Sequence, residues 1–204
     1  EVADRQSVTV SDKFEAVGTV EAAEAITVVS EVDAVVTSLP FGEGQDIEEG
    51  GLIAQLDDQQ IAAAFASAEA TRDQARIIYE RTKSIVEAGA GAKQELDAAT
   101  ADLKVADAQL EQARVRLSKT KIRAPFAGVL GARLVSPGAF LRSGASLATP
   151  ITTLTQISRL KIVFSAPERV FSLLKRGSEV TITNPAYPGY SLIGKIDVID
   201  PVVD

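Results

Sequence analysis

The chain has no cysteine, histidine, methionine or tryptophan, and only 5% of its 204 residues are aromatic. Without cysteine it can form no disulfide, no thiolate nucleophile and no zinc–thiolate site. Without histidine it lacks the commonest general base and metal ligand, and without methionine it lacks the soft ligand that a copper(I) carrier uses. We therefore expect no cofactor, and any metal binding would have to depend on carboxylates alone.

Long apolar runs are also missing, so no segment of the sequence is predicted to span a bilayer. No secretory signal is visible and the chain starts at Glu1, which indicates a mature or trimmed piece of a longer protein. Hydrophobic residues make up 46% of the chain and charged residues 24%. This composition predicts a folded, globular chain and argues against disorder.

The charge of the chain is negative and unevenly spread. A net charge of −7 argues against a nucleic-acid partner, because phosphate contacts need a basic surface. Residues 1–56 carry 12 acids and 2 bases, whereas residues 121–204 carry 5 acids and 10 bases. We expect the acidic first block and the basic last block to attract each other, within one chain or between neighbouring copies.

An internal repeat links two segments that lie far apart in the sequence. Residues 34–50 read AVVTSLPFGEGQDIEEG and residues 128–144 read GVLGARLVSPGAFLRSG. At an offset of 94 the matches are Val35 with Val129, Gly44 with Gly138, Ile47 with Leu141 and Gly50 with Gly144. Each half predicts short strands separated by glycine turns. Two such halves, related by a pseudo-two-fold axis, would form one small β-sandwich, with the oppositely charged Glu48 and Arg142 at equivalent turns.

Residues 57–120, between the two halves, predict an antiparallel helical hairpin. The second helix has a seam of leucines at Leu96, Leu103, Leu110 and Leu117, alternating with alanines at Ala99, Ala106 and Ala113. Spacings of 3 and 4 are typical of a helix packed lengthwise on another. For the first helix we predict a looser seam through Ile61, Ala64, Ala68, Thr71, Ala75, Ile78, Thr82 and Ile85. Gly89 and Gly91 mark the turn, and the short connection favours an antiparallel pair about 45 Å long.

The two ends of the chain both read as β-structure. Residues 1–28 and 151–204 alternate polar and apolar side chains, and together they predict one β-barrel-like module that looks incomplete. The fold class predicted from the sequence is α+β and elongated. A helical hairpin is inserted in a split sandwich of residues 29–56 and 121–150, next to the partial barrel.

This plan resembles the membrane fusion proteins, which are periplasmic adaptor subunits of exporters. The resemblance depends on VVTSLPFGEGQDIEEGGLIAQLDD before the hairpin and TKIRAPFAGVLGARLVSPGAFLRSG after it. The stretch LKIVFSAPERVFSLLKRG looks particularly like the branch that serves resistance-nodulation-division (RND) efflux pumps, within the haemolysin-secretion-adaptor-like superfamily. In that family the split sandwich is a lipoyl-like domain.

The resemblance implies a function and a set of partners. It implies an adaptor that joins an inner-membrane RND transporter to an outer-membrane channel, for export of drugs or other small molecules. It also implies self-association, as a hexameric ring or a trimer of dimers. The location implied is the periplasm of a Gram-negative bacterium, attached to the inner membrane by an anchor outside these 204 residues.

The same resemblance implies a docking site for the channel at the hairpin tip. The family's tip pattern of arginine, leucine and serine falls here on Arg81, Ile85 and Ala92. Arg81 matches the pattern and Ile85 is a mild change, but Ala92 departs from it. A serine at that position would cap the second helix, and its replacement by alanine costs ~1 kcal/mol unless another residue takes over.

Three other functions remain as alternatives. An adaptor of an ABC-type or type I exporter would share the fold, although type I adaptors usually have longer hairpins. A lipoyl or biotinyl carrier would need a lysine on the hairpin turn of the sandwich, and no lysine lies at Leu56–Asp58. An enzyme could use the acid pairs Asp57–Asp58 or Glu48–Glu49, but adjacent side chains on a turn usually point apart. We therefore predict no catalytic residues.

Overall fold

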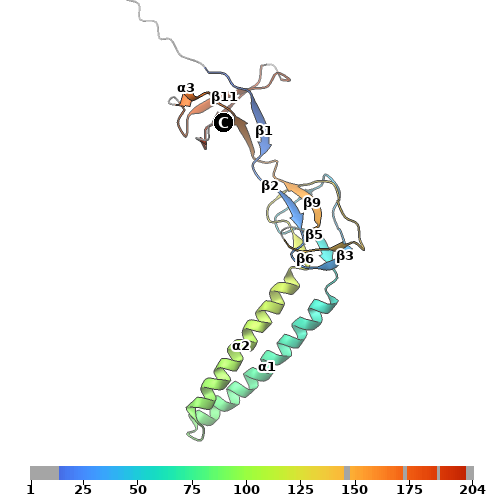
Figure 1. Cartoon of the computed structure of the whole chain (residues 1–204), viewed down its shortest axis with the longest axis vertical. Helices are drawn as coiled ribbons and strands as arrows, with labels where there is room; N and C mark the ends of the chain where they lie inside the picture. Colours follow the sequence, from blue (N-terminus) through green and yellow to red (C-terminus); the bar gives the residue numbers. More distant parts are fainter. Residues whose placement is uncertain (1–13, 145–147, 172–173, 188, 201–204) are drawn as a thin grey trace, which may run out of the picture. The chain divides into compact units, whose positions relative to one another are not determined.

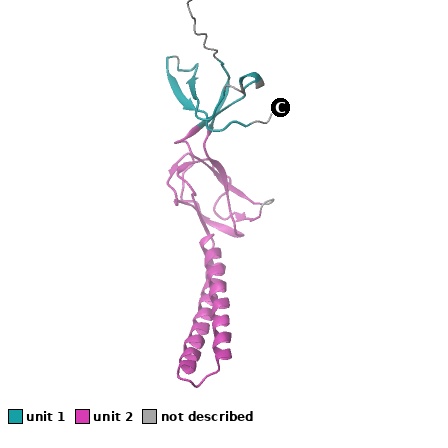
Figure 2. Cartoon of the chain, turned by 90° about the vertical axis from the view of Figure 1, so that its left-hand side faces the viewer, with its two compact units in different colours: residues 1–21, 161–204 teal, residues 22–160 magenta. Residues whose placement is uncertain are grey.

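The computed structural model describes residues 14–144, 148–171, 174–187 and 189–200 of the chain. They form two compact units, drawn in different colours in Figure 2. Unit 2 comprises the described residues within 22–160, and unit 1 comprises those within 1–21 and 161–204.

Unit 2 contains a β-sandwich of two four-stranded sheets. Its strands are β2 (Ala25–Val29), β3 (Ala34–Ser38), β4 (Asp46–Ile47), β5 (Leu52–Leu56), β6 (Lys121–Arg123), β7 (Gly128–Leu130), β8 (Phe140–Leu141) and β9 (Pro150–Thr155). One sheet has the order β2-β9-β7-β4 and the other β6-β5-β3-β8. Each sheet therefore mixes strands from both sides of the hairpin, so neither half of the sequence can form the sandwich alone.

The strand register follows the sequence repeat. In one sheet Ile47 of β4 pairs with Gly128 of β7, and in the other Leu141 of β8 pairs with Ala34 of β3. Adding 94 to the number of Ile47 gives Leu141, and subtracting 94 from that of Gly128 gives Ala34, so the two pairs are equivalent. The two halves thus exchange places about a pseudo-two-fold axis, and the predicted split sandwich is confirmed.

The turns of the two halves are equivalent as well. The turn glycines all have positive φ, namely Gly44 (72°), Gly50 (78°), Gly138 (89°) and Gly144 (108°). Such angles are unfavourable for residues with a Cβ atom. The Gly44 N–H donates to the carbonyl of Leu130 at 2.9 Å, and the equivalent Gly138 N–H donates to the carbonyl of Val36 at 2.8 Å. Each half therefore ties its turn to a strand of the other half.

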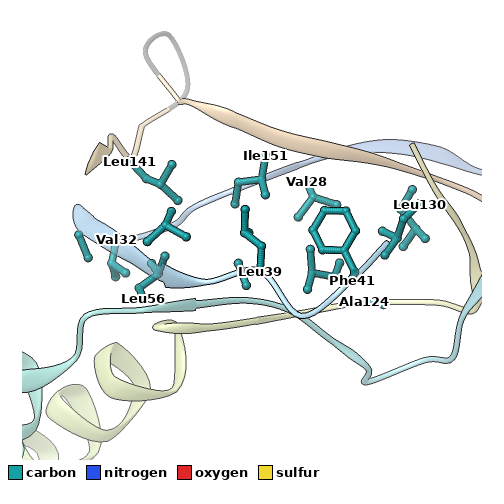
Figure 3. Close-up of a cluster of buried hydrophobic side chains, with 14 residues drawn as sticks. Val28, Val32, Leu39, Phe41, Leu56, Ala124, Leu130, Leu141 and Ile151 are labelled. Atoms are coloured by element: carbon teal, nitrogen blue, oxygen red, sulfur yellow. The ribbon is translucent and has the colours of Figure 1, made fainter. Parts of the chain in front are cut away.

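The core of the sandwich lies between the two sheets (Figure 3). It is lined by Val28, Val32, Ala34, Val36, Leu39, Phe41, Ile53, Ala54, Leu56, Ala124, Leu130, Leu141, Ile151 and Leu154. Of the residues that the predicted boundaries assign to the barrel, Val28, Ile151 and Leu154 belong to this core. The structure therefore puts the boundaries at residues 21/22 and 160/161 rather than at 28/29 and 150/151. The reason is that β2 and β9 pair with each other, and β9 pairs with β7.

The helical hairpin of unit 2 projects from the sandwich (Figure 1). It consists of α1 (Gln59–Glu87) and α2 (Lys93–Ser118), which is slightly less than the predicted 57–120. Strand β5 leads into α1 and α2 leads into β6, and these two strands are neighbours in one sheet. The Leu56 N–H donates to the Thr120 carbonyl at 2.9 Å, so the hairpin is an insertion between two paired strands.

Unit 1 is built from strands at both ends of the described chain and is the partial β-barrel of the fold. Strand β1 (Gly18–Ala22) pairs with β10 (Leu160–Phe164), and β11 (Glu179–Thr183) pairs with β12 (Ser191–Lys195). The helix α3 (Glu168–Phe171) lies between β10 and β11. None of the helices in the described ranges is both long enough and apolar enough to cross a membrane.

Candidate partner-binding surface on the hairpin

The seam of α2 lies where the leucine and alanine spacing predicts. All seven predicted positions, from Leu96 to Leu117, are buried or half-buried, and Ala99, Ala106 and Leu110 are at most 6% exposed. Apart from Thr100, the other residues of α2 are exposed. The inner face of α2 is therefore a single narrow stripe, as in a coiled coil.

The seam of α1 differs from the predicted one at every second position. Its half-buried residues at alternating spacings of 4 and 3 are Ile61, Phe65, Ala68, Arg72, Ala75, Tyr79, Thr82 and Val86. The predicted positions Ala64, Thr71, Ile78 and Ile85 are exposed instead. At each of these four positions the half-buried residue is the next one along the chain. It is larger than the predicted residue in three cases, and the exception is Val86, which follows Ile85.

Size complementarity explains the observed seam. Aligning the two half-buried seams of this antiparallel hairpin outward from Thr82 and Leu96 puts at equal levels Tyr79 with Ala99, Ala75 with Leu103, Arg72 with Ala106, Ala68 with Leu110, Phe65 with Ala113, and Ile61 with Leu117. A large side chain of one helix thus meets a small one of the other at nearly every level. The alanines of α2 leave space that only a large side chain can fill, because well-packed interfaces leave few voids.

The tip of the hairpin closes with a Schellman motif. The Ala90 N–H donates to the Ile85 carbonyl at 3.1 Å, and the Gly89 N–H donates to the Val86 carbonyl at 3.0 Å. Gly89 has a φ of 78°, the left-handed conformation that this motif requires. The first helix therefore ends near the predicted Gly89 because this glycine adopts the left-handed backbone conformation.

Gly91 and Ala92 form the start of α2. A Cβ on Gly91 would lie 2.9 Å from Val86 Cγ2 and 3.2 Å from Ile85 Cγ2, so glycine allows the close return of the chain. Ala92 is the N-cap, with extended φ and ψ and no side-chain hydrogen bond to the first turn. The amides of that turn therefore lack the side-chain acceptor that a serine would supply.

The three predicted docking residues are all exposed near the tip. Ile85 is 44% exposed, Arg81 lies one turn before it, and Ala92 begins the returning helix. Among the described residues Arg81 has no ion-pair partner, whereas Arg76 pairs with Glu80 of the same helix. An exposed guanidinium beside an exposed isoleucine suits a contact with another protein, since arginine is enriched in such interfaces.

The predicted pair of sandwich turn residues does not form an ion pair within the described chain. Glu48 and Arg142 lie at equivalent turns, and the Arg142 backbone N–H donates to Thr149 Oγ1 at 3.2 Å. Attraction between the acidic first block and the basic last block does occur elsewhere, because Lys161 Nζ lies 3.2 Å from Glu21 Oε2. Pairing of Glu48 with Arg142 between copies stays a prediction.

Two polar links of the sandwich are not predicted from the sequence. The Arg133 backbone N–H donates to Glu43 at 2.9 Å, and its guanidinium donates to the carbonyls of Leu39 and Phe41 and lies over the Phe41 ring. Arg133 thereby joins the two halves of the sandwich. The offset of 94 gives no sign of this, because it matches Arg133 to the buried Leu39.

The second link is centred on Asp33. Its Oδ1 accepts hydrogen bonds from the Ser143 backbone N–H at 2.6 Å and the Ser143 hydroxyl at 2.7 Å. These two bonds hold the pKa of Asp33 below its usual value, with a smaller contribution from nearby Arg142 and Arg116. The carboxylate thus ties the loop before β3 to the end of β8.

The acid pairs considered as catalytic candidates lie at the start of a helix and in a turn, where they take part in local hydrogen bonds. Asp57 Oδ1 accepts the Gln59 N–H at 3.1 Å, so this carboxylate satisfies the first amide of α1, one residue before the N-cap Asp58. Glu48 lies in the turn between β4 and β5, where its carbonyl accepts the Gly51 N–H. In the described ranges, no group of three acidic side chains is arranged to hold a metal ion.

Comparison with known proteins assigns the family. Residues 24–153, more than half of the chain, match the model of the RND membrane fusion protein (MFP) barrel-sandwich hybrid domain. The chain belongs to the RND membrane fusion proteins. The matched residues contain the whole hairpin and nearly all of the sandwich described above.

Relatives within this family share the sequence over most of the chain. The multidrug resistance protein MdtA of Yersinia pestis is 32% identical over 165 residues, which cover 74% of this chain and 37% of the relative. MdtA of Proteus mirabilis is 29% identical over 183 residues, covering 82% of this chain and 44% of the relative. The chain therefore spans less than half the length of the curated relatives that it matches.

A solved structure shows the same arrangement of hairpin and sandwich. A MacA–MexA chimera that carries the Pseudomonas aeruginosa MexA α-hairpin domain superimposes with a TM-score of 0.78 at 28% identity. The alignment covers 91% of this chain and 66% of the chimera. The family suggested by the flanking motifs in the sequence is thereby confirmed.

Proposed function

We propose that this chain is part of a periplasmic adaptor subunit of a tripartite efflux pump. The adaptor links an inner-membrane RND transporter to an outer-membrane channel and supports export of drugs or other small molecules. Membership of the RND membrane fusion family and similarity to multidrug resistance proteins support the proposal. The structural observation that carries it is the helical hairpin, which projects from the sandwich and ends in exposed Arg81 and Ile85.

In this proposal the protein acts by geometry and carries out no reaction. The sandwich supplies a rigid base, because its core joins both halves of the sequence. The hairpin, with helices of 29 and 26 residues, supplies reach toward the channel. Copies of the adaptor assemble into a ring, as a hexamer or a trimer of dimers, in the periplasm at the inner membrane. The full-length protein carries the membrane anchor.

The experiment that tests this proposal asks which proteins the adaptor binds. The full-length protein is purified from membranes of its own host, and the co-purifying transporter and channel are identified. We expect an RND transporter and an outer-membrane channel. An ABC exporter in place of the RND transporter would favour the alternative adaptor function, and purification with no transporter would contradict the proposal.

The tip is tested with variants that place a negative charge there. Ile85→Glu and Arg81→Glu should reduce recovery of the channel at least fivefold while leaving recovery of the transporter unchanged, because only the tip is altered. Arg76→Glu is the matched control, since Arg76 lies on the same helix and is also exposed. Equal loss of the channel in all three variants would refute a docking site at Arg81 and Ile85.

A further inference from the structure

The backbone links between the hairpin and the sandwich lie along the end of one sheet. Strand β5 leads into α1 and α2 leads into β6, and both strands belong to the sheet β6-β5-β3-β8. The Leu56 N–H donates to the Thr120 carbonyl at 2.9 Å, and the Asp57 N–H donates to the Val35 carbonyl of β3 at 2.8 Å. Because these links form a single row, they oppose a tilt of the hairpin toward the other sheet only weakly.

A tilt at this base is amplified at the tip of the hairpin. At about 1.5 Å per residue, the 29 residues of α1 span about 43 Å, and a tilt of ~10° displaces their far end by about 7 Å. A displacement of that size breaks any side-chain contact made at the tip. Docking through Arg81 and Ile85 therefore requires that the tilt of the hairpin is fixed.

The loop between β2 and β3, residues 30–33, offers a contact outside this row of links. It starts from β2, which belongs to the other sheet. Ser30 and Val32 are buried, and the Ser30 hydroxyl donates to the Val32 carbonyl at 2.5 Å. The alternation leaves Glu31 and Asp33 exposed. Figure 3 shows Val32 at the end of the core that lies next to the helices, so the two acids are placed to meet the hairpin.

The basic end of α2 meets this acidic loop. Lys119 is the C-cap of α2, and its Nζ lies 2.7 Å from Glu31 Oε2. The pKa of Asp33 is lowered mainly by its hydrogen bonds from Ser143, and the charge of Arg116, in the last turn of α2, adds to this shift. Basic side chains are also favoured at a helix C-terminus by the helix dipole. Two bases of the hairpin thus attract two acids of the sandwich.

The internal repeat indicates that the sandwich itself does not need these acids. In the other half, the equivalent loop at the offset of 94 comprises residues 124–127 and closes the same core. Its residues at the two positions are uncharged, namely Pro125 for Glu31 and Ala127 for Asp33. Acids therefore occur in only one of two equivalent loops, the one that contacts the hairpin.

We propose that the Glu31–Lys119 ion pair is a positioning contact that fixes the tilt of the hairpin on the sandwich. The pair joins the end of α2 to the loop that leaves β2, so it acts outside the row of links along β6, β5 and β3. Attraction between Arg116 and Asp33 supports the same contact. This inference deepens the proposed function and rests on it for its consequence, which is that the tip is held where the channel can bind it.

Hydrogen exchange at the base of the hairpin tests the contact. The full-length protein carrying Glu31→Lys is compared with the natural protein, and the peptide followed is the one that contains Leu56 and Asp57. Their amides donate to Thr120 and Val35, so they become exposed when the base opens. We expect this peptide to exchange at least threefold faster in the variant, because two positive charges then face each other.

A charge swap and a salt series separate the ion pair from other effects of the substitution. In the double variant Glu31→Lys/Lys119→Glu, exchange of the same peptide should return to within twofold of the natural protein. At about 1 M salt, where the Debye length is about 3 Å, exchange of the natural protein should rise toward that of Glu31→Lys. The matched control is Glu24→Lys, an exposed acid at the other end of β2, which should not change exchange.

Two results of this experiment would overturn the positioning contact. One is unchanged exchange in Glu31→Lys, and the other is a charge swap that exchanges as fast as Glu31→Lys alone. Neither result depends on a transporter or a channel, because exchange is measured on the adaptor without partners.

Co-purification from host membranes tests the consequence for docking. Glu31→Lys should lower recovery of the channel at least threefold without loss of the transporter, and the charge swap should restore the channel. If Glu31→Lys loosens the base but channel recovery is unchanged, the positioning role is overturned and the adaptor function stands. If the natural protein recovers no transporter, the adaptor function is refuted, whereas the exchange result still decides the contact.

Discussion

Replacing Arg72 by leucine should stabilise the hairpin. Arg72 occupies a seam position of α1, level with Ala106, and its side chain is only 23% exposed. Its Nε is buried and finds no hydrogen-bond acceptor among the described residues. The guanidinium reaches Asp73 through Nη1, at 3.2 Å. The hairpin thus holds one unsatisfied donor in the middle of a largely apolar seam.

The size of the effect follows from three contributions. A buried donor without a partner costs about 1–3 kcal/mol, and this cost disappears in Arg72→Leu. A half-buried ion pair between neighbouring residues, such as that with Asp73, contributes about 0–1 kcal/mol, which is lost. The apolar stem of arginine already packs in the seam, so leucine keeps most of that packing. The net gain is about 1 kcal/mol, or a fivefold smaller population of the opened hairpin.

Amide hydrogen exchange measures this opening locally. We expect the amides in the middle of α1 to exchange about fivefold more slowly in Arg72→Leu than in the natural chain. Arg76→Leu is the matched control, because Arg76 is 52% exposed and lies outside the seam, and it should not slow exchange. If Arg72→Leu exchanges as fast as the control or faster, the unsatisfied donor does not limit hairpin stability.

Three further predictions concern the hairpin seam, the sandwich and its pH dependence. Leu110→Ala should lower the unfolding free energy of the hairpin by about 2–3 kcal/mol. Val105→Ala, on the exposed side, is the control and should lower it by less than ~1 kcal/mol. Urea unfolding measures both. Gly128→Ala should destabilise the sandwich by about 1–3 kcal/mol, because its Cβ would lie 2.5 Å from a carbonyl oxygen of β9; Gly42→Ala, which meets only a flexible side chain, is the control in thermal unfolding. Asp33→Asn should lower the melting temperature at neutral pH. Since the pKa of Asp33 is lowered in the folded state, its stabilisation is fully present above the usual carboxyl pKa and is lost below about pH 4, so the difference between variant and natural chain should shrink there.

The sandwich could be predicted from the sequence because both halves preserve the same spacing of strands and glycine turns. The constant offset between residues 34–50 and 128–144 fixes which strands are equivalent. Positive φ at Gly44 and Gly138 then makes glycine necessary at matching places. The limits of the sandwich were harder to predict, since β2 and β9 alternate polar and apolar residues as barrel strands do. Only the pairing of β2 with β9, and of β9 with β7, assigns them to the core.

The periodicity of a single helix cannot decide which of two adjacent residues faces the other helix of the hairpin. Adjacent candidates such as Ile78 and Tyr79 both give a spacing of 3 and 4, so periodicity alone allows either seam. The choice depends on the other helix, where Ala99 leaves space for the large Tyr79. The role of Arg133 could not be predicted for a related reason, because its hydrogen-bond partners lie in the other half of the sandwich. For Ala92 the sequence does predict the missing cap, since no nearby side chain replaces it.

The way the hairpin joins the sandwich allows the hairpin to be lengthened, shortened or replaced as a unit. Its two ends leave from neighbouring paired strands through short links on either side, and the Leu56–Thr120 hydrogen bond closes the sheet beneath them. Whole heptads can therefore be added to or removed from both helices together without disturbing a residue of the core. A family built on this plan can change its span, and exchange its distal recognition surface, while inheriting the same base.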